Sequence, residues 1–262
     1  MQLASSQTKR VFTAPDGVEL AWHEMGEGRP IVLLHGLFSN AATNWIRFGS
    51  AAAMAARGFR VIMSDLRGHG SSARPHHASA YPPDILADDG LALIGHLGFE
   101  DYDLGGYSLG GRTAVRMVVR GAAPRRLVIA GMGLQGLLDT GARSAHFKEI
   151  LRGLGHHQRG SPEWMAEAFL KTTGGDPQAL LPLLDSFVDT PEPALRAIAL
   201  PTLVLSGADD HDNGSAKALA NLLPHSRYVE IPGNHMSAVT KPDLGRAIAD
   251  FLAVDHPLAE AQ

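Results

Sequence analysis

A serine flanked by two glycines stands where a short apolar run meets a helical pattern. Gly106, Ser108 and Gly110 form a Gly-x-Ser-x-Gly motif between the apolar run 102–106 and the helical pattern 109–120. On a sharp strand-to-helix turn the serine backbone is strained, and side chains two positions to either side would clash. Because such a turn lifts the hydroxyl above the carboxyl edge of a sheet, we predict that Ser108 is a nucleophile.

A serine hydroxyl becomes a good nucleophile only when a neighbouring base takes its proton. Of the 13 histidines, His235 stands apart because it follows an apolar run through a Pro-Gly-Asn turn and precedes the last helical pattern. Asp209, Asp210 and Asp212 follow another such run, and an aspartate there would hold the imidazole in the required tautomer. Parallel strands end at one edge of a sheet, so these loops should open beside Ser108. Spacing alone leaves the three aspartates as alternatives.

Acyl transfer to a serine also requires two hydrogen-bond donors where negative charge develops in the transition state. We predict that the amides of Leu109, directly after the serine, and of Leu37, in a His-Gly-Leu-Phe loop, form this oxyanion hole. Gly36 lets the backbone of that loop approach closely. Phe38 and Tyr107 adjoin the two turns, so we predict that they line a substrate pocket.

The elements that must position these residues are short β-branched apolar runs that alternate with helical patterns. We predict strands at 11–14, 18–24, 31–34, 60–64, 102–106, 126–130, 202–206 and 227–231, and helices at 50–57, 82–97, 109–120 and 237–254. The first two strands flank a Pro-Asp-Gly turn and should form an antiparallel hairpin. Strand-helix alternation elsewhere predicts an α/β fold with a mostly parallel, doubly wound sheet of about eight strands.

One connection is too long for an ordinary crossover. The 68 residues from 133 to 200 separate two predicted strands and carry their own helix starts, in which Ser161, Asp176 and Thr190 each precede a proline. We predict that residues 133–200 form a helical cap. The core domain would then comprise residues 1–132 and 201–262.

Three large apolar residues of this segment share one face of a predicted helix. Trp164, Met165 and Phe169 could meet an apolar group of a substrate or pack inside the cap, and the pattern leaves both alternatives open. For the segment 133–200 as a whole, the alternative to a cap is a set of extra surface helices that have no role over a site.

Together these residues resemble the α/β-hydrolase family, in serine esterase- and lactonase-like members with a helical cap. The chain order Ser108, Asp210, His235 matches the order of nucleophile, acid and histidine in that family. In that family the acid loop usually has the sequence Gly-x-x-Asp, which this chain matches at Gly207 and Asp210. The resemblance therefore implies Asp210 as the acid.

A second stretch of the chain carries the same resemblance. Residues 65–71 look like a family signature loop in which Asp65 and Arg67 brace neighbouring turns, which implies that His69 is not catalytic. Haloalkane dehalogenases and epoxide hydrolases of this fold place aspartate at the nucleophile position, where this chain has Ser108. The resemblance thus implies a serine hydrolase that needs no cofactor.

We therefore predict that the protein hydrolyses a small or medium carboxylic ester or lactone through an acyl-enzyme on Ser108. Hydrolysis of a carbon–carbon bond in a vinylogous diketone, or of an enol-lactone, is the alternative chemistry, because relatives with those activities share a serine and a helical cap. A non-catalytic receptor that uses the same capped cavity is the alternative of another class.

Composition limits the partners of the 262-residue chain. The net charge of −4 and the lack of a long basic block give no electrostatic support for a nucleic-acid or anionic-membrane partner. With no cysteine the chain has no disulfide, thiolate nucleophile or thiolate metal site. The pairs His76-His77 and His156-His157 lack partners at metal-ligand spacing, so we expect no metal. No apolar run approaches the ~20 residues that span a bilayer, and we expect a cytoplasmic monomer or homodimer.

Overall fold

The first two strands pair as an antiparallel hairpin, in a computed structural model that describes residues 8–254. β1 (Thr8–Thr13) and β2 (Glu19–Met25) flank a turn in which the Asp16 carboxylate accepts a hydrogen bond from the Val18 amide at 3.2 Å. Gly17 occupies the turn at φ 85°, a conformation that glycine adopts without a steric penalty. The hairpin predicted from Pro-Asp-Gly is therefore confirmed.

Six further strands complete a single sheet in which the order is β1-β2-β4-β3-β5-β6-β7-β8. They are β3 (Arg29–Leu34), β4 (Phe59–Ser64), β5 (Asp103–Tyr107), β6 (Leu127–Ala130), β7 (Thr202–Gly207) and β8 (Ser226–Ile231). The pairs from β4 through β3 to β8 are all parallel, whereas β2 pairs antiparallel with both β1 and β4. The predicted eight-stranded, mostly parallel α/β sheet is confirmed.

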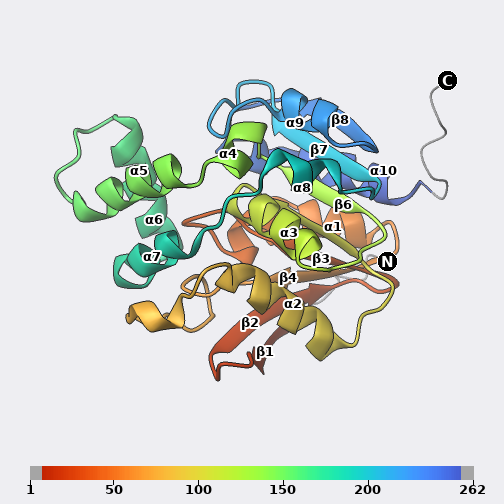
Figure 1. The fold of residues 1–262 in the computed structure, drawn as a ribbon, viewed down its shortest axis with the longest axis horizontal. Coiled ribbons are helices and arrows are strands. Elements are labelled where there is room, and N and C mark those ends of the chain that lie inside the picture. Colours follow the sequence, from red (N-terminus) through yellow and green to blue (C-terminus); the bar gives the residue numbers. More distant parts are fainter. Residues whose placement is uncertain (1–7, 255–262) are drawn as a thin grey trace.

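Helices cover both faces of the sheet (Figure 1), and successive side chains of the central strands point alternately to one face and to the other. In β3, Ile31 and Leu33 belong to the buried apolar cluster that includes α1 and α10, while Val32 and Leu34 belong to the cluster on the other face, with α2, α3 and α9. These helices are α1 (Ser50–Ala55), α2 (Ile85–Leu97), α3 (Leu109–Val119), α9 (Ala216–Leu222) and α10 (Pro242–Leu252). A parallel sheet buried on both faces explains why its strands read as nearly continuous apolar runs.

The segment between β6 and β7, residues 133–200, is helical and is called the helical insertion below. It contains α4 (Leu134–Leu138), α5 (Gly141–Arg152), α6 (Pro162–Thr173), α7 (Pro177–Leu183), the short η3 (Leu184–Ser186) and α8 (Glu192–Arg196). In Figure 1, α5, α6 and α7 extend to one side of the sheet. The side chains of Ser161 and Asp176 cap α6 and α7 as predicted.

Three local predictions need correction. Thr190 does not cap α8, whose N-cap is Pro191 with no side-chain hydrogen bond, so the helix begins one residue later than the cap-proline pattern indicates. Asp84 has φ 66° and delays α2 to Ile85, and a break before Pro242 divides the last predicted helix into η4 (Ala238–Thr240) and α10. The sequence reading assigned no element to α9, or to η1 (Ala42–Ile46) and η2 (Ala78–Ala80).

Strand register brings the predicted functional loops together at one edge. Leu34 pairs with Gly106, so the loop that follows β3 leaves the sheet beside the turn that follows β5. Gly207 pairs with Ile231, so the loops after β7 and β8 also leave side by side. The carboxyl ends of these parallel strands therefore assemble four segments that are far apart in the sequence.

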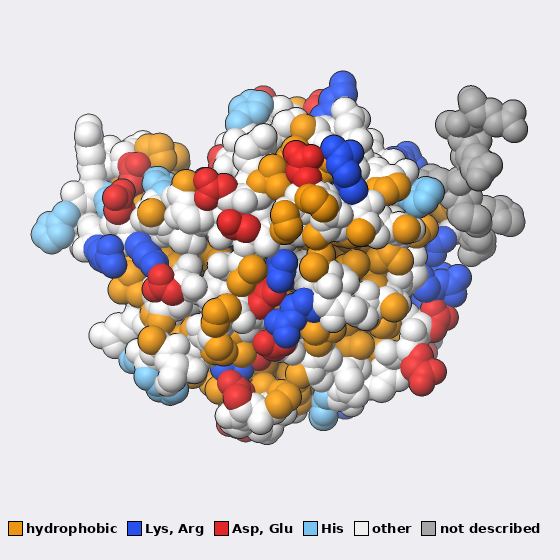
Figure 2. Space-filling model, viewed as in Figure 1, with side chains coloured by type: hydrophobic (Ala, Val, Ile, Leu, Met, Phe, Trp, Pro, Cys, Tyr) orange, Lys and Arg blue, Asp and Glu red, His pale blue; other side chains and the backbone are white. Residues whose placement is uncertain are grey.

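Charged side chains of both signs share the face of the molecule drawn in Figure 2. On the face drawn in Figure 2, Lys and Arg side chains are scattered among Asp and Glu side chains and do not gather into one patch. Within residues 8–254, none of the helices combines the length and the hydropathy that a transmembrane span requires.

Candidate active site

Ser108 lies on a strained turn between the end of β5 and the start of α3. Its backbone has φ 54° and ψ −115°, a combination that non-glycine residues rarely adopt. A Cβ atom on Gly106 would lie 2.2 Å from the Gly110 carbonyl carbon, and one on Gly110 would lie 2.0 Å from the Leu34 oxygen. The two glycines are thus required because the backbone of the turn packs against itself and against the end of β3.

The structure brings together the three residues predicted to form a catalytic triad. The Ser108 Oγ atom lies 3.0 Å from His235 Nε2, and His235 Nδ1 lies 2.9 Å from Asp210 Oδ2. The serine is half-buried, and the side chains of His235 and Asp210 are 13% and 4% exposed. This chain of hydrogen bonds has the geometry in which an imidazole accepts the serine proton while a carboxylate orients the ring.

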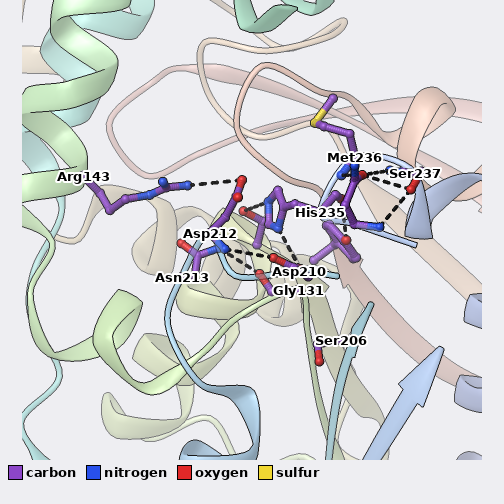
Figure 3. Close-up of polar contacts among 12 residues, drawn as sticks. Gly131, Arg143, Ser206, Asp210, Asp212, Asn213, His235, Met236 and Ser237 are labelled. Atoms are coloured by element: carbon purple, nitrogen blue, oxygen red, sulfur yellow. Dashed lines mark hydrogen bonds and ion pairs between the residues drawn. The ribbon is translucent and has the colours of Figure 1, made fainter. Parts of the chain in front are cut away.

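The structure distinguishes among the three aspartates that spacing left open. Figure 3 shows Asp210 directed at His235, whereas Asp212 points toward Arg143 of α5. Asp209 is exposed and contributes only its backbone amide, which donates to the Gly233 carbonyl. Burial raises the pKa of Asp210, but the hydrogen bond and charge of His235 outweigh burial and hold the pKa below its ordinary value. Asp210 is therefore ionised at neutral pH.

The loop after β3 lies against the serine turn. A Cβ atom on Gly36 would be 3.4 Å from the Ser108 Cβ atom, so the two backbones are in close contact. Asn44 accepts a hydrogen bond from the Gly36 amide at 3.0 Å, and His35 Nδ1 lies 2.8 Å from the Gly36 carbonyl oxygen. Leu37 follows Gly36 directly and Leu109 follows Ser108, so the two predicted oxyanion residues belong to backbone segments that are in close contact.

Sequence reasoning missed two side chains that hold this loop. Asn44 lies on η1, and His35 Nε2 accepts a hydrogen bond from the Leu66 amide at 3.0 Å. Burial lowers the pKa of His35, which keeps the ring neutral and able to accept that bond. The His-Gly pair of the predicted oxyanion loop was the signal for His35, although it did not indicate this contact, and nothing local indicated Asn44.

The loop at residues 65–71 has the bracing contacts that the resemblance implies. The Asp65 carboxylate accepts hydrogen bonds from the amides of Ala41 and Ser71, both at 2.8 Å. Burial opposes ionisation of Asp65, yet contacts with His23 and these amides lower its pKa to about 2. His69 is fully buried and its pKa is lowered to about 3 by burial, so it stays neutral and lies outside the hydrogen-bonded triad.

Tyr107 lies under the histidine loop. Its side chain is 3% exposed, its hydroxyl donates to the His235 carbonyl at 2.6 Å, and its ring centroid is 5.4 Å from that of His235. Burial raises the pKa of the phenol further above its ordinary value, so the hydroxyl remains a donor. These contacts replace the predicted pocket role of Tyr107 with a position that supports the histidine.

The helical insertion reaches the loop after β3 through Phe38. Phe38 has φ 60°, its ring packs edge-on against Phe147 of α5 at 5.4 Å, and its carbonyl accepts a hydrogen bond from Thr173 of α6 at 2.6 Å. Phe38 is 2% exposed, so it forms part of the contact between insertion and core. Two helices of the insertion thus hold the residue that follows Leu37.

The other predicted pocket residues divide between surface and interior. Trp164 is 37% exposed and Met165 is 56% exposed, so neither packs inside the insertion, which was one of the two alternatives. Phe169 is partly buried against the apolar core of the molecule. Among residues 8–254, no group of three or more His, Asp and Glu side chains is arranged to hold a metal ion.

Comparison with known proteins places this arrangement in a family. A model described as "Alpha/beta hydrolase family" matches residues 31–245. A non-heme haloperoxidase from Rhodococcus erythropolis is 30% identical over 258 residues, which cover 84% of this chain and 90% of the relative. A 2-hydroxymuconate semialdehyde hydrolase from Pseudomonas sp. (strain CF600) is 33% identical over 116 residues, which cover 44% of this chain and 40% of that relative.

Solved structures show the same fold. A bromoperoxidase from Bacillus anthracis superposes with a TM-score of 0.73 at 23% identity and covers 94% of this chain and 99% of its own. A thermophilic esterase from Thermogutta terrifontis gives a TM-score of 0.74 at 24% identity, over 95% of this chain and 98% of its own. With the family model and the haloperoxidase, these likenesses lead to one conclusion: the chain belongs to the alpha/beta hydrolase family.

Proposed function

We propose that this hydrolase cleaves a small or medium carboxylic ester or lactone through an acyl-enzyme on Ser108. The observation that carries the proposal is the continuous hydrogen-bond chain from Ser108 Oγ through His235 to Asp210, at 3.0 and 2.9 Å. The strained backbone of Ser108 supports it, because backbone strain of this kind concentrates at functional sites.

In the proposed reaction His235 takes the hydroxyl proton while Ser108 Oγ attacks the carbonyl carbon. The amides of Leu37 and Leu109 stabilise the oxyanion of the tetrahedral intermediate. As this intermediate collapses, His235 returns the proton to the departing alkoxide, and the alcohol leaves. Water then attacks the acyl-enzyme by the same sequence, which releases the acid and restores Ser108. The ionised Asp210 stabilises the imidazolium that forms in each half-reaction.

The helical insertion is proposed to act as a cap over this site, with its bounds at residues 133–200. Its contacts with Phe38, on the loop that carries Leu37, support this role. Arg74, from the loop after β4, also donates to the Gly174 carbonyl at 2.8 Å, directly after α6. The partly buried Phe169 and the exposed Trp164 and Met165 of the insertion then remain the candidates to contact an apolar substrate group.

The test combines a covalent probe with a substrate screen. We expect stoichiometric labelling by a fluorophosphonate, absent in Ser108→Ala, and turnover of carboxylic esters or lactones that is lost in the same variant. A His235→Ala variant should lose most turnover and keep its unfolding temperature. Folded wild-type protein that neither takes up the probe nor turns over any ester would contradict the proposal and favour a receptor. Cleavage of diketones without ester turnover would instead assign carbon–carbon bond hydrolysis.

A further inference from the structure

Two donors hold the carbonyl of Gly36, in the peptide group that also contains the Leu37 amide. His35 Nδ1 lies 2.8 Å from the Gly36 oxygen, and the Ser39 amide donates to the same oxygen at 3.1 Å. The second bond closes a four-residue turn in which only Phe38, at φ 60°, has a positive φ, as in a type II turn. The peptide between Gly36 and Leu37 is therefore fixed on its carbonyl side.

The hydrogen bonds of His35 determine which ring nitrogen carries the proton. The Leu66 amide donates to Nε2 at 3.0 Å, so Nε2 has no hydrogen. The ring is fully buried and burial lowers its pKa, so it is neutral and has its one N–H at Nδ1. Nδ1 is thus the donor to the Gly36 carbonyl, and the ring connects this carbonyl to the loop after β4.

The place of β3 in the sheet sets the direction of the Leu37 N–H. β3 lies between β4 and β5, and Leu66 follows β4 whereas Ser108 follows β5. The Gly36 carbonyl points to the His35 ring, and hence toward β4. In a trans peptide the N–H and the C=O point in opposite directions, so the Leu37 N–H points toward β5 and the nucleophile. Within residues 8–254 this N–H donates to no acceptor, so it is available to an oxyanion.

Asn44 holds the peptide on the other side of Gly36. Its Oδ1 accepts the Gly36 N–H at 3.0 Å, and its side chain is buried. The Nδ2 of Asn44 makes no hydrogen bond with any described residue, so the polar contact of this side chain is the one to Gly36. Glycine has no side chain to limit its own backbone, so both peptides that flank Gly36 depend on groups from elsewhere.

We propose that His35 and Asn44 are positioning residues that together fix the direction of the Leu37 amide toward the oxyanion. The proposal rests on the proposed function, in which Leu37 is a donor, and adds the residues that aim this donor. Neither side chain touches substrate or exchanges a proton in the reaction. Their effect should therefore appear in the transition state, where charge develops on the oxyanion, and not in the binding of substrate.

Two substitutions separate the two hydrogen bonds of the His35 ring. The amide nitrogen of Asn stands as far along the side chain as Nδ1, and the amide oxygen of Gln stands as far along as Nε2. His35→Asn therefore keeps a donor for the Gly36 carbonyl, whereas His35→Gln keeps an acceptor for the Leu66 amide. Each variant loses one buried hydrogen bond, so the two should lose similar stability.

We expect His35→Gln to lower kcat on an ester about 10- to 100-fold at constant KM, less than the loss of a whole donor because Ser39 still holds the carbonyl. His35→Asn should restore most of this kcat, and Asn44→Leu should resemble His35→Gln. The control is Thr202→Val at the start of β7, which removes a buried hydroxyl that donates to the Leu200 carbonyl at 2.8 Å. It should lower stability and leave kcat unchanged.

A transition-state analogue tests the aim of the amide apart from turnover. Phenylboronic acid forms a bond from boron to Ser108 Oγ as His235 takes the proton, and the tetrahedral boronate places an oxygen where the oxyanion would lie. In protein labelled with ¹⁵N-leucine, the boronate should shift the Leu37 amide proton, which is identified by its absence in Leu37→Met. His35→Gln should reduce this shift, and its inhibition constant for the boronate should rise by the factor by which kcat/KM falls.

The outcomes separate failure of the positioning role from failure of the proposed function. Ester turnover with kcat unchanged in His35→Gln, or with equal losses in His35→Gln and His35→Asn, would overturn the positioning role and keep the esterase. A Leu37 amide proton that the boronate leaves unshifted in wild type would overturn it as well. Wild-type protein that turns over no ester would contradict the esterase, while the shift of the Leu37 amide still tests the direction of the peptide.

Discussion

The hydroxyl of Tyr107 gives a sharp test of how the histidine loop is held. Tyr107→Phe removes one hydroxyl, which donates to the His235 carbonyl at 2.6 Å, and leaves a buried ring of the same shape. Loss of a hydrogen bond that leaves a buried acceptor unpaired costs roughly 1–3 kcal/mol. For a chain of this length that cost corresponds to a fall in unfolding temperature of about 2 °C or more.

The same change should affect catalysis through the position of the imidazole. Tyr107 touches no substrate in the proposed mechanism, so KM should stay constant while kcat falls. If about 1–2 kcal/mol of the lost interaction is felt in the transition state, kcat decreases by a factor of roughly 5–30. Steady-state kinetics on a turned-over ester, with thermal unfolding in parallel, measures both effects.

Tyr81 provides a matched control for this experiment. Its side chain is 4% exposed, and its hydroxyl donates to the Pro75 carbonyl at 2.9 Å, away from the triad. Tyr81→Phe should therefore lower the unfolding temperature by a similar amount and leave kcat unchanged. If Tyr107→Phe loses stability but keeps kcat within twofold of wild type, the hydroxyl does not position His235 and the reasoning is refuted.

Three further predictions test other parts of the site. Asp210→Asn should lower kcat by ~10⁴-fold, because an amide does not fix the imidazole tautomer. Asp212→Asn, assayed on a neutral ester, should keep kcat within a few-fold of wild type. Similar losses of kcat in the two variants would refute the assignment of Asp210 as the acid. Gly106→Ala should lower the free energy of unfolding by roughly 1–3 kcal/mol or prevent folding, because the added Cβ atom would lie 2.2 Å from the Gly110 backbone. As a control, Gly95→Ala in α2 should be neutral or stabilising, because no atom lies within 4 Å of the added Cβ atom. Denaturant titrations measure both changes. Asp65→Asn should lower the free energy of unfolding by about 2 kcal/mol at neutral pH, because the pKa of Asp65 in the folded protein, about 2, lies below its ordinary value of 3.8. The difference in unfolding free energy between wild type and variant should become smaller as the pH falls from 4 toward 2, because the carboxylate is protonated there. A difference that becomes larger over this pH range would contradict the lowered pKa.

The sequence was sufficient to predict which residues meet at the proposed site, because local patterns and sheet topology determine their positions together. The glycines around Ser108 mark a turn that few other residues tolerate, and each candidate partner follows a strand that ends at the same edge. One-dimensional spacing could not separate Asp209, Asp210 and Asp212, because all three lie in one irregular loop. Their choice depends on which carboxylate the loop turns toward His235, and that is a tertiary property.

The supporting side chains escaped prediction for a related reason. Tyr107 and the His235 carbonyl are 128 positions apart, and Arg143 meets Asp212 only because the fold brings α5 beside the acid loop. Neither contact leaves a local pattern in the sequence. For Trp164 and Met165, helical periodicity placed both on one face, and only the structure shows that this face is exposed and does not pack inside the insertion.

The contacts of Phe38 connect the helical insertion to the loop of the proposed oxyanion hole. A residue held at φ 60° outside glycine is strained, and such a conformation persists only where its surroundings hold it in place. Here Phe147 and Thr173, from α5 and α6, hold its ring and its carbonyl. Phe38 directly follows Leu37, whose backbone amide is the proposed oxyanion donor. The contacts of α5 and α6 with Phe38 therefore help to hold the backbone segment that directly follows the proposed donor.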